Sequence, residues 1–193
     1  MATLRALLLA PPGAGKGTQG TLLAERFGVP HIATGDLLRQ HVAEATAIGL
    51  EARGFMDRGE LVPDEIVLAL VLACIAGPEP LDGFVLDGFP RNLPQAEAAF
   101  RWGRDRDRTF HAVITLHVED DELVRRLIER GRAAGRVDDT EATIRQRLAV
   151  YGDQTAPLLD FYGERRILVE IDGTGEVDEV FARIVEAVEP LVG

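Results

Sequence analysis

The sequence predicts an α/β fold in which helices cover both faces of a central, parallel, five-stranded sheet. Two observations lead to this prediction: strand-length apolar runs alternate with helical segments, and several of these runs are continuously apolar, as strands buried on both faces are. In a chain of 193 residues, no apolar run approaches the roughly 20 residues needed to span a bilayer. We therefore expect one domain over residues 1–193, without a membrane partner and located in the cytoplasm.

Each expected element follows from its local pattern. Residues 4–10 form an apolar run that leads directly into a glycine loop, which favours a core strand over a signal peptide. The other expected strands are residues 29–33, 83–87, 111–118 and 165–172. The expected helices are residues 17–28, 34–45, 46–58, 62–76, 120–131, 141–163 and 176–191.

The loops and helix ends complete this outline. Gly28 is expected to end the first helix, and Thr34 or Asp36 can cap the second. Residues 101–110 mix charges of both signs and are expected to form a solvent-exposed connection. Ligands of a parallel sheet bind at the carboxyl ends of its strands. The loops expected to converge there follow Ala10, Ala33, Asp87, Val118 and Asp172.

The composition excludes several classes of protein. A net charge of −11 argues against nucleic acid as the main partner, because a phosphate backbone requires a basic surface. The chain has no serine, which excludes a serine nucleophile, and its one cysteine, Cys74, excludes a paired-cysteine zinc site. Of its 21 basic residues, 20 are arginine, and the one lysine is Lys16 in the glycine loop.

The segment LLLAPPGAGKGTQG, residues 7–20, has the order of a phosphate-binding loop: a strand, a glycine turn and a helix. Glycines in the turn permit positive φ and close approach of the backbone to phosphate. Lys16 can bridge the terminal phosphates of a nucleotide, and Thr18 places a hydroxyl near a magnesium ion. Two positions depart from the plain pattern: Ala10 replaces the first glycine, and Gly17 stands where a hydroxyl residue is expected.

The stretch PPGAGKGTQ resembles the phosphate loop of the nucleoside monophosphate kinases, above all the adenylate kinases, which place Gly-Lys-Gly-Thr here. Gly17 therefore fits the family, whereas Ala10 replaces its usual glycine. An alanine in the left-handed region costs on the order of 1 kcal/mol, whereas an alanine still in the strand costs little. By the resemblance, the loop residues that bind ATP are Gly13, Ala14, Gly15, Lys16, Gly17 and Thr18.

Two further stretches, TGDLLR (34–39) and LDGFPRNLPQ (86–95), resemble the AMP-binding segments of the same family. The resemblance implies that Thr34 and Gln95 hydrogen-bond the adenine and that Arg39 and Arg91 hold the AMP phosphate. An amide suits a purine edge because it offers a donor and an acceptor in one plane. One arginine guanidinium can donate two parallel hydrogen bonds to two phosphate oxygens. The backbone expected to line the pocket comprises Glu60, Leu61, Val62, Gly88, Phe89 and Pro90.

Residues 125–148 concentrate arginines in an otherwise acidic chain. Acidic residues lie among them, so part of this cluster is expected to be a salt-bridged helix surface. RGRAAGRVDD (130–139) resembles the short lid of the monophosphate kinases, which lacks the zinc of longer lids. The resemblance implies that Arg126 flanks the ATP base, Arg130 contacts its phosphates, and Gly173 contacts the base through its backbone. Arg136 and Arg147 would reach the transferred phosphoryl group and AMP.

The implied reaction is ATP + AMP ⇌ 2 ADP, with Asp87 and Thr18 holding Mg²⁺ through water. The catalytic residues would be Lys16, Arg91, Arg130, Arg136 and Arg147, because phosphoryl transfer needs alignment and charge stabilisation more than a general base. Residues 34–63 would close over AMP and a lid at residues 130–140 over ATP, in a chain that works as a monomer with ATP, AMP and ADP as its only partners.

Three alternatives remain open, and relatives that consume GTP are a lesser variant. UMP/CMP kinases share the fold but tend to carry alanine and asparagine at the positions of Thr34 and Gln95. A phosphate-loop ATPase would lack a phosphoryl acceptor, and a non-catalytic nucleotide-binding protein finds its only support in Ala10. A GTPase switch is excluded, because its Asn-Lys-x-Asp motif needs a second lysine.

Overall fold

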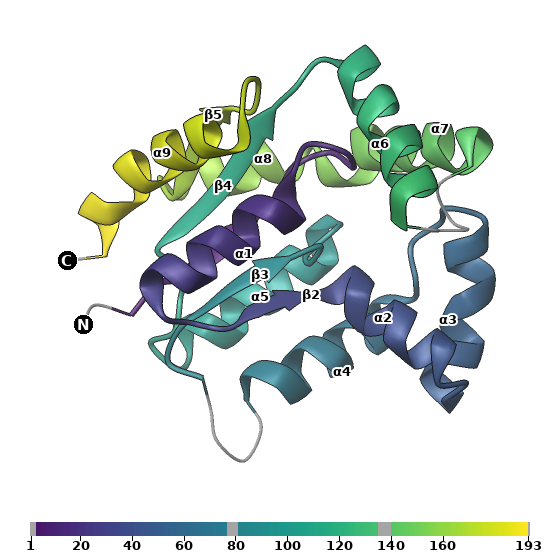
Figure 1. The fold of residues 1–193 in the computed structure, drawn as a ribbon. Helices are drawn as coiled ribbons and strands as arrows, with labels where there is room; N and C mark the ends of the chain where they lie inside the picture. The colour runs from purple at the N-terminus through teal and green to yellow at the C-terminus, as the bar shows by residue number, and fades with distance from the viewer. Residues whose placement is uncertain (1–2, 77–80, 135–139, 193) are drawn as a thin grey trace.

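Five parallel strands form the central sheet within residues 3–76, 81–134 and 140–192, which the computed structural model describes (Figure 1). The strands are β1 (Arg5–Leu8), β2 (His31–Ala33), β3 (Phe84–Asp87), β4 (Ala112–His117) and β5 (Leu168–Asp172). Their order across the sheet is β2-β3-β1-β4-β5, and each neighbouring pair is parallel. The predicted fold class and all five predicted strands are therefore confirmed.

Helices connect the strands on both faces of the sheet. They are α1 (Lys16–Phe27), α2 (Thr34–Ala43), α3 (Ala47–Asp57), α4 (Asp64–Ile75), α5 (Leu93–Arg104), α6 (Asp120–Ala134), α7 (Glu141–Val150), α8 (Leu158–Gly163) and α9 (Val177–Val188). A π-helical turn, Tyr151–Thr155, joins α7 to α8, and a 3-10 turn, Glu189–Leu191, follows α9. None of the described helices is both long and apolar enough to cross a bilayer.

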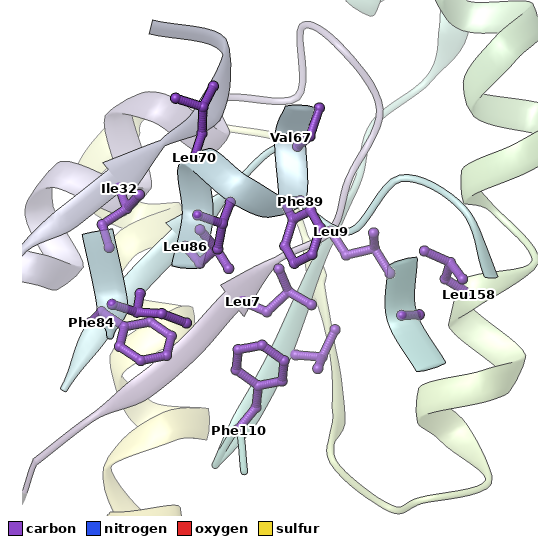
Figure 2. Packing of buried hydrophobic residues seen from close by; sticks show 14 of the residues in the cluster. Leu7, Leu9, Ile32, Val67, Leu70, Phe84, Leu86, Phe89, Phe110 and Leu158 are labelled. Atoms are coloured by element: carbon purple, nitrogen blue, oxygen red, sulfur yellow. The ribbon is translucent and has the colours of Figure 1, made fainter. Parts of the chain in front are cut away.

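The alternation of side chains along each strand builds two separate cores. Leu7 of β1 and Phe84 of β3 point into a core with α4, α5 and α8, in which Phe84 packs edge-on against Phe110 at 6.2 Å (Figure 2). Leu8 of β1 and Val85 of β3 point to the opposite face, into a core with α1, α6 and α9. Because successive strand residues face opposite sides, this division produces the three layers. Burial of one such leucine contributes about 1.5–3 kcal/mol.

Helix α5 was not predicted from the sequence. The prediction of a solvent-exposed connection at residues 101–110 is wrong for residues 101–104, which form its last turn. The local signals are nevertheless present: the Asn92 side chain caps the helix by accepting from the Gln95 N–H at 3.0 Å, and Pro94 lies in the first turn. Packing completes the helix, because Ala96 is fully buried in the core beside the sheet.

The predicted helix over residues 141–163 is interrupted. Pro157 has no N–H to donate, and its ring would clash with the carbonyl of Asp153 in a continuous α-helix. The chain instead passes through the π-helical turn before α8 begins. π-helical turns are frequent at functional sites, and this one directs Thr155 toward the loop after β3, where its hydroxyl donates to the Arg91 carbonyl at 2.7 Å.

Two predicted helix boundaries have different outcomes. Gly28 ends α1 in the left-handed conformation with φ 65°, as predicted. The prediction that Thr34 or Asp36 caps α2 is wrong: Ala33 occupies the N-cap position, and no side chain bonds to the helix end. Thr34 instead donates to the Asp87 carbonyl at 3.1 Å, which ties the start of α2 to the end of β3.

Candidate active site

A cavity of about 890 Å³ opens at the carboxyl ends of the strands. Loops after β1, β2, β3 and β5 line it, and α6 and α7 close its far side. The predicted site residues in its lining are Gly13, Ala14, Gly15, Lys16, Gly17, Thr18, Arg39, Leu61, Asp87, Gly88, Pro90, Arg91, Arg126, Arg130, Arg147 and Gly173. The convergence expected of a parallel sheet therefore brings segments from most of the chain to one place.

Two of the three loop glycines have the backbone conformation expected of them. Gly13 has φ 89° and Gly15 has φ 98°, both in the left-handed region that favours glycine. A Cβ on Gly13 would also lie 2.8 Å from the Leu123 carbonyl oxygen, so the loop can pass α6 only without a side chain. The expectation of positive φ is wrong for Gly17, which lies in the first turn of α1 with open space at its Cβ position.

Ala10 does not strain the loop. Among the described residues, the non-glycine positions with positive φ are Ala45, Asp107 and Arg166, so Ala10 lies outside the left-handed region. Its side chain is buried in the core beneath α1 and α9, and its carbonyl faces the loop. Of the two alternatives for Ala10, the unstrained conformation, in which alanine costs little, is therefore the correct one.

The first turn of α1 is built to receive an anion. Its N-cap is Gly15, no side chain bonds to the exposed backbone N–H groups, and the turn contains no acidic residue. The first N–H groups of a helix have no partner within the helix and carry a partial positive charge. A phosphate group placed there satisfies both the hydrogen-bonding groups and the helix dipole.

Lys16, the first residue of α1, extends back over the glycine loop. Its Nζ donates to the carbonyls of Ala10 at 2.7 Å and Pro11 at 3.0 Å. Withdrawal from water is the main cause that lowers the pKa of the ammonium to about 8, with Asp87 opposing the shift and the nearby arginines adding to it. The Lys16 ammonium is partly withdrawn from water and bonded only to neutral carbonyls, so a phosphate anion that binds beside it would stabilise its charge.

A second group of cations lines the opposite side of the cavity. Burial lowers the pKa of Arg91 to about 10, with Arg147 and Arg39 adding to the shift and Asp87 opposing it. The Arg91 Nε donates to the Gly88 carbonyl at 2.7 Å, and Arg39 pairs with Asp36 at 2.5 Å. Mutual repulsion among these guanidinium groups decreases when a polyanion binds between them.

Gly88 holds the loop after β3 close to α2. It has φ 81°, and a Cβ there would lie 2.6 Å from the Thr34 hydroxyl. The peptide bond between Phe89 and Pro90 is cis. This tight loop brings Arg91 back over the end of β3, next to Asp87.

Five predicted site residues are described but do not form part of the cavity lining: Thr34, Glu60, Val62, Phe89 and Gln95. Thr34 and Gln95 are both almost fully buried. The Gln95 amide is engaged on both sides, by the Arg91 N–H and by Asp64, while Glu60 pairs with Arg58 at 2.7 Å. Arg136 lies outside the described residues.

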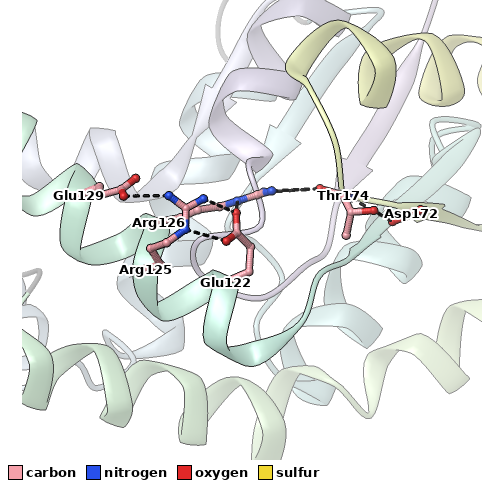
Figure 3. Close-up of polar contacts among 7 residues, drawn as sticks. Glu122, Arg125, Arg126, Glu129, Asp172 and Thr174 are labelled. Atoms are coloured by element: carbon pink, nitrogen blue, oxygen red, sulfur yellow. Dashed lines mark hydrogen bonds and ion pairs between the residues drawn. The ribbon is translucent and has the colours of Figure 1, made fainter.

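The arginines of α6 have two kinds of surroundings. Arg125 pairs with Glu122 at 2.7 Å and with Glu129 at 2.8 Å on the helix surface, as predicted for part of the cluster (Figure 3). Arg126 also binds Glu122, at 2.7 Å, but its guanidinium extends to the Gly173 carbonyl at 3.5 Å in the loop after β5. Glu122, whose pKa falls to about 2 through bonds from both arginines, thus orients Arg126 toward the loop after β5.

Several lining residues were not predicted from the sequence: Gln19, Glu122, Tyr151 and Thr155. Gln19 follows the glycine loop and donates to the Val177 carbonyl at 3.0 Å, which links α1 to the start of α9. One sequence feature could have pointed to Thr155: Pro157 indicates an interruption of the helix at the turn that contains Thr155. Glu122 and Tyr151 have no local signal that separates them from ordinary helix residues.

The described residues contain no group of three or more histidine, cysteine, aspartate or glutamate side chains that could hold a metal. This finding leaves no zinc-binding group in that part of the chain. Asp87 and Thr18, by contrast, both line the cavity beside Lys16. A carboxylate and a hydroxyl suit Mg²⁺, which prefers oxygen ligands and keeps several waters when it binds with a nucleotide phosphate.

A glycine loop between strand and helix, a partly buried lysine and an arginine-lined cavity define a phosphate-loop nucleotide-binding protein. A family model described as adenylate kinase matches residues 8–167 of the chain. The adenylate kinase of Rhodococcus erythropolis is 49% identical over 184 residues, 95% of this chain and 98% of the relative. The adenylate kinase of Mycobacteroides abscessus is 50% identical with the same coverage, and that of a Nocardioides species is 46% identical over 96% and 97%. The chain belongs to the adenylate kinase family.

Proposed function

We propose that this chain catalyses the reversible transfer of a phosphoryl group from Mg-ATP to AMP, giving two ADP. One observation carries the proposal: a single cavity joins a phosphate loop on one side to an arginine-lined loop on the other, with Lys16 and Asp87 between them. Two phosphate-binding surfaces that face each other suit a donor and an acceptor nucleotide. The adenylate kinase names of the relatives agree with this assignment.

The ATP side of the cavity consists of the loop and the arginines of α6. The proposed ATP-binding residues are Gly13, Ala14, Gly15, Lys16, Gly17, Thr18, Arg126, Arg130 and Gly173. The backbone N–H groups of the loop would cradle the phosphates, and Lys16 would exchange its two carbonyl partners for phosphate oxygens. Arg126 would flank the base, since its guanidinium already contacts the Gly173 carbonyl in the loop after β5.

The AMP side consists of the start of α2 and the loop after β3. The proposed AMP-binding residues are Thr34, Arg39, Glu60, Leu61, Val62, Gly88, Phe89, Pro90, Arg91, Gln95, Arg136 and Arg147. Arg39 and Arg91 would hold the phosphate in bidentate pairs, which relieves the repulsion that lowers the pKa of Arg91. Adenine would reach Thr34 and Gln95, with each group adding a hydrogen bond to those it already makes.

Catalysis on this arrangement rests on alignment and charge. Lys16, Arg91, Arg130, Arg136 and Arg147 are the proposed catalytic residues. Their charges would stabilise the transferred phosphoryl group, and arginines in this role contribute about 10³–10⁵ in rate. The attacking oxygen of AMP is already an anion at neutral pH, so no general base is required. Asp87 and Thr18 would hold Mg²⁺ through water, and the ion supplies further positive charge at the ATP phosphates.

Two segments are proposed to close the cavity. Residues 34–63, which contain α2 and α3, would close over AMP, and a lid at residues 130–140 would close over ATP. Helices α2 and α3 pack mainly on each other (Figure 1), and α2 has smaller contacts with α4, β2 and β3, so the two helices would move together about the start of α2. Closure would exclude water, which otherwise competes with AMP for the phosphoryl group.

A UMP/CMP kinase of the same fold is the second candidate. Its support is that Thr34 and Gln95, the two residues expected to select adenine, do not line the cavity. A phosphate-loop ATPase is less well supported, because it would not need the loop after β3.

We also propose that the protein works in the cytoplasm as a monomer, in agreement with a net charge of −11 that opposes self-association. Light scattering tests this proposal, because a monomer should give a molar mass of 21.0 kDa.

Nucleotide conversion followed by chromatography tests the proposed function. The protein is given Mg-ATP with AMP, CMP, UMP or no acceptor, and with AMP in the absence of Mg²⁺. Rapid formation of ADP with AMP alone, dependent on Mg²⁺ and lost in Lys16→Met, is the expected result. Preference for CMP or UMP would favour the second candidate, and free phosphate without an acceptor would favour an ATPase.

A further inference from the structure

A partly buried polar cluster lies behind the AMP side of the cavity. Asp64 is the first residue of α4, at the point where the proposed AMP-binding segment rejoins the core. Its Oδ1 accepts from the Asn92 amide at 2.8 Å and from the Gln95 amide at 2.5 Å. Neither the family resemblance nor the cavity lining singles out Asp64.

These contacts fix which way the Gln95 amide faces. Its Nε2 donates to the Asp64 carboxylate, and its Oε1 accepts from the Arg91 N–H at 2.8 Å. A 180° flip would place Oε1 against a carboxylate that can only accept and Nε2 against an N–H that can only donate. Gln95 is only 3% exposed, so water could not replace the lost bonds.

The neighbouring groups hold this arrangement in place. The Asn92 Oδ1 caps α5 through the Gln95 N–H, which requires its Nδ2 to face Asp64. On the other side, the Arg91 carbonyl accepts from the Thr155 hydroxyl at 2.7 Å. The backbone of Arg91 is thus held between Gln95 and Thr155, and each member of the cluster has one hydrogen-bonding orientation.

The orientation of a glutamine amide determines which purine it reads. The edge of adenine offers an amino donor and a ring-nitrogen acceptor, whereas hypoxanthine offers a carbonyl acceptor and a ring N–H donor. An amide free to flip pairs with either edge, and an amide fixed in one orientation pairs with only one of them. We propose that Asp64 is a positioning residue that gives the enzyme its preference for adenine by fixing the Gln95 amide. This inference rests on the proposed role of Gln95 as the reader of the AMP base.

The test compares Asp64→Asn with a matched control, Glu65→Gln. Both changes remove one negative charge from the first turn of α4 while keeping the size of the side chain, but Glu65 is exposed and its side chain is absent from the cluster. An asparagine at position 64 can accept or donate, so it removes one of the two contacts that fix the Gln95 amide, and only the Arg91 N–H then opposes a flip. We measure kcat and KM for ATP, AMP and IMP, together with the thermal melting temperature.

Asp64→Asn is expected to lower the ratio of kcat/KM for AMP to that for IMP by about tenfold or more. The KM for ATP is expected to stay within about twofold of the wild type, as is every parameter of Glu65→Gln. A structural role alone would change stability or all substrates together and leave the AMP-to-IMP ratio unchanged. If Asp64→Asn folds poorly, Asp64→Ser provides the same test, since a hydroxyl also donates or accepts.

An unchanged AMP-to-IMP ratio in folded Asp64→Asn or Asp64→Ser would overturn the inference. Gln95→Met separates this failure from a failure of the proposed function. If Gln95→Met loses the preference for AMP while the Asp64 variants keep it, then Gln95 recognises the base as proposed, but Asp64 does not position it. If the wild type does not phosphorylate AMP, or if Gln95→Met has no effect on the ratio, the proposed assignment fails and this inference fails with it.

Discussion

The pKa of Lys16 predicts an unusual pH dependence of ATP binding. In the free protein, removal from water lowers this pKa to about 8, whereas an ordinary lysine titrates near 10.5. Bound phosphates stabilise the ammonium and raise its pKa again, so only the protonated protein binds ATP tightly. Affinity should therefore be constant well below pH 8 and fall as the pH rises through that value.

The size of the effect follows from the protonated fraction. For a pKa of about 8, this fraction falls from about three quarters near pH 7.5 to about 3% near pH 9.5. The expected loss of affinity is about 25-fold, or about 1.9 kcal/mol. The phosphates of ATP are themselves fully ionised over this range, because their last pKa lies near 6.

Titration calorimetry with Mg-ATP, in the absence of AMP, measures this dependence at several pH values in that interval. Lys16→Arg is the control, because a guanidinium stays charged throughout and should give a profile that is nearly flat. Equal affinity of the wild type at both ends of the range would refute the reasoning. The same would follow if Lys16→Arg showed the slope of the wild type, since the titrating group would then lie elsewhere.

Two further substitutions test packing, one in the core and one at the glycine loop. The Tyr162 hydroxyl is fully buried without a partner among the described residues, so Tyr162→Phe should leave the free energy of unfolding unchanged or raise it by up to about 1–3 kcal/mol. A clear loss of stability in urea unfolding would contradict this. Ala10→Gly should leave kcat unchanged and lower the free energy of unfolding by about 0.5–1 kcal/mol, because Ala10 is unstrained and buried. A several-fold gain in kcat would instead mean that alanine strains the loop.

The elements predicted most accurately are those whose pattern lies within a few residues. The glycine loop, its lysine and the strand that ends at Asp87 are each specified by one short stretch, and all lie at the cavity. Helix α5 was missed although Asn92 and Pro94 mark its start, because its mixed charges resemble those of an exposed loop. The interruption at Tyr151–Thr155 was missed because the helical pattern continues through it and only Pro157 signals the break.

The cost of Ala10 was decided by backbone geometry. The residue type permits either a strained or an unstrained conformation, and only the path of the chain after β1 distinguishes them. The same limit applies to Gly17, whose position in the motif suggested a positive φ that a helical residue does not have. A motif gives the type of residue at a position but not its dihedral angles.

The sequence by itself determined the fold class, the phosphate loop and the set of charged residues from which the site is built, because these depend on local periodicity and motif spacing. The tertiary structure alone decided which of those groups are already engaged. Gln95 bonds to Asp64 across 31 positions of the chain, and Thr155 bonds to Arg91 across 64. Hydrogen bonds between distant segments form where the sheet brings loops together, and burial of a cation such as Lys16 shifts its pKa only after the surrounding elements have packed.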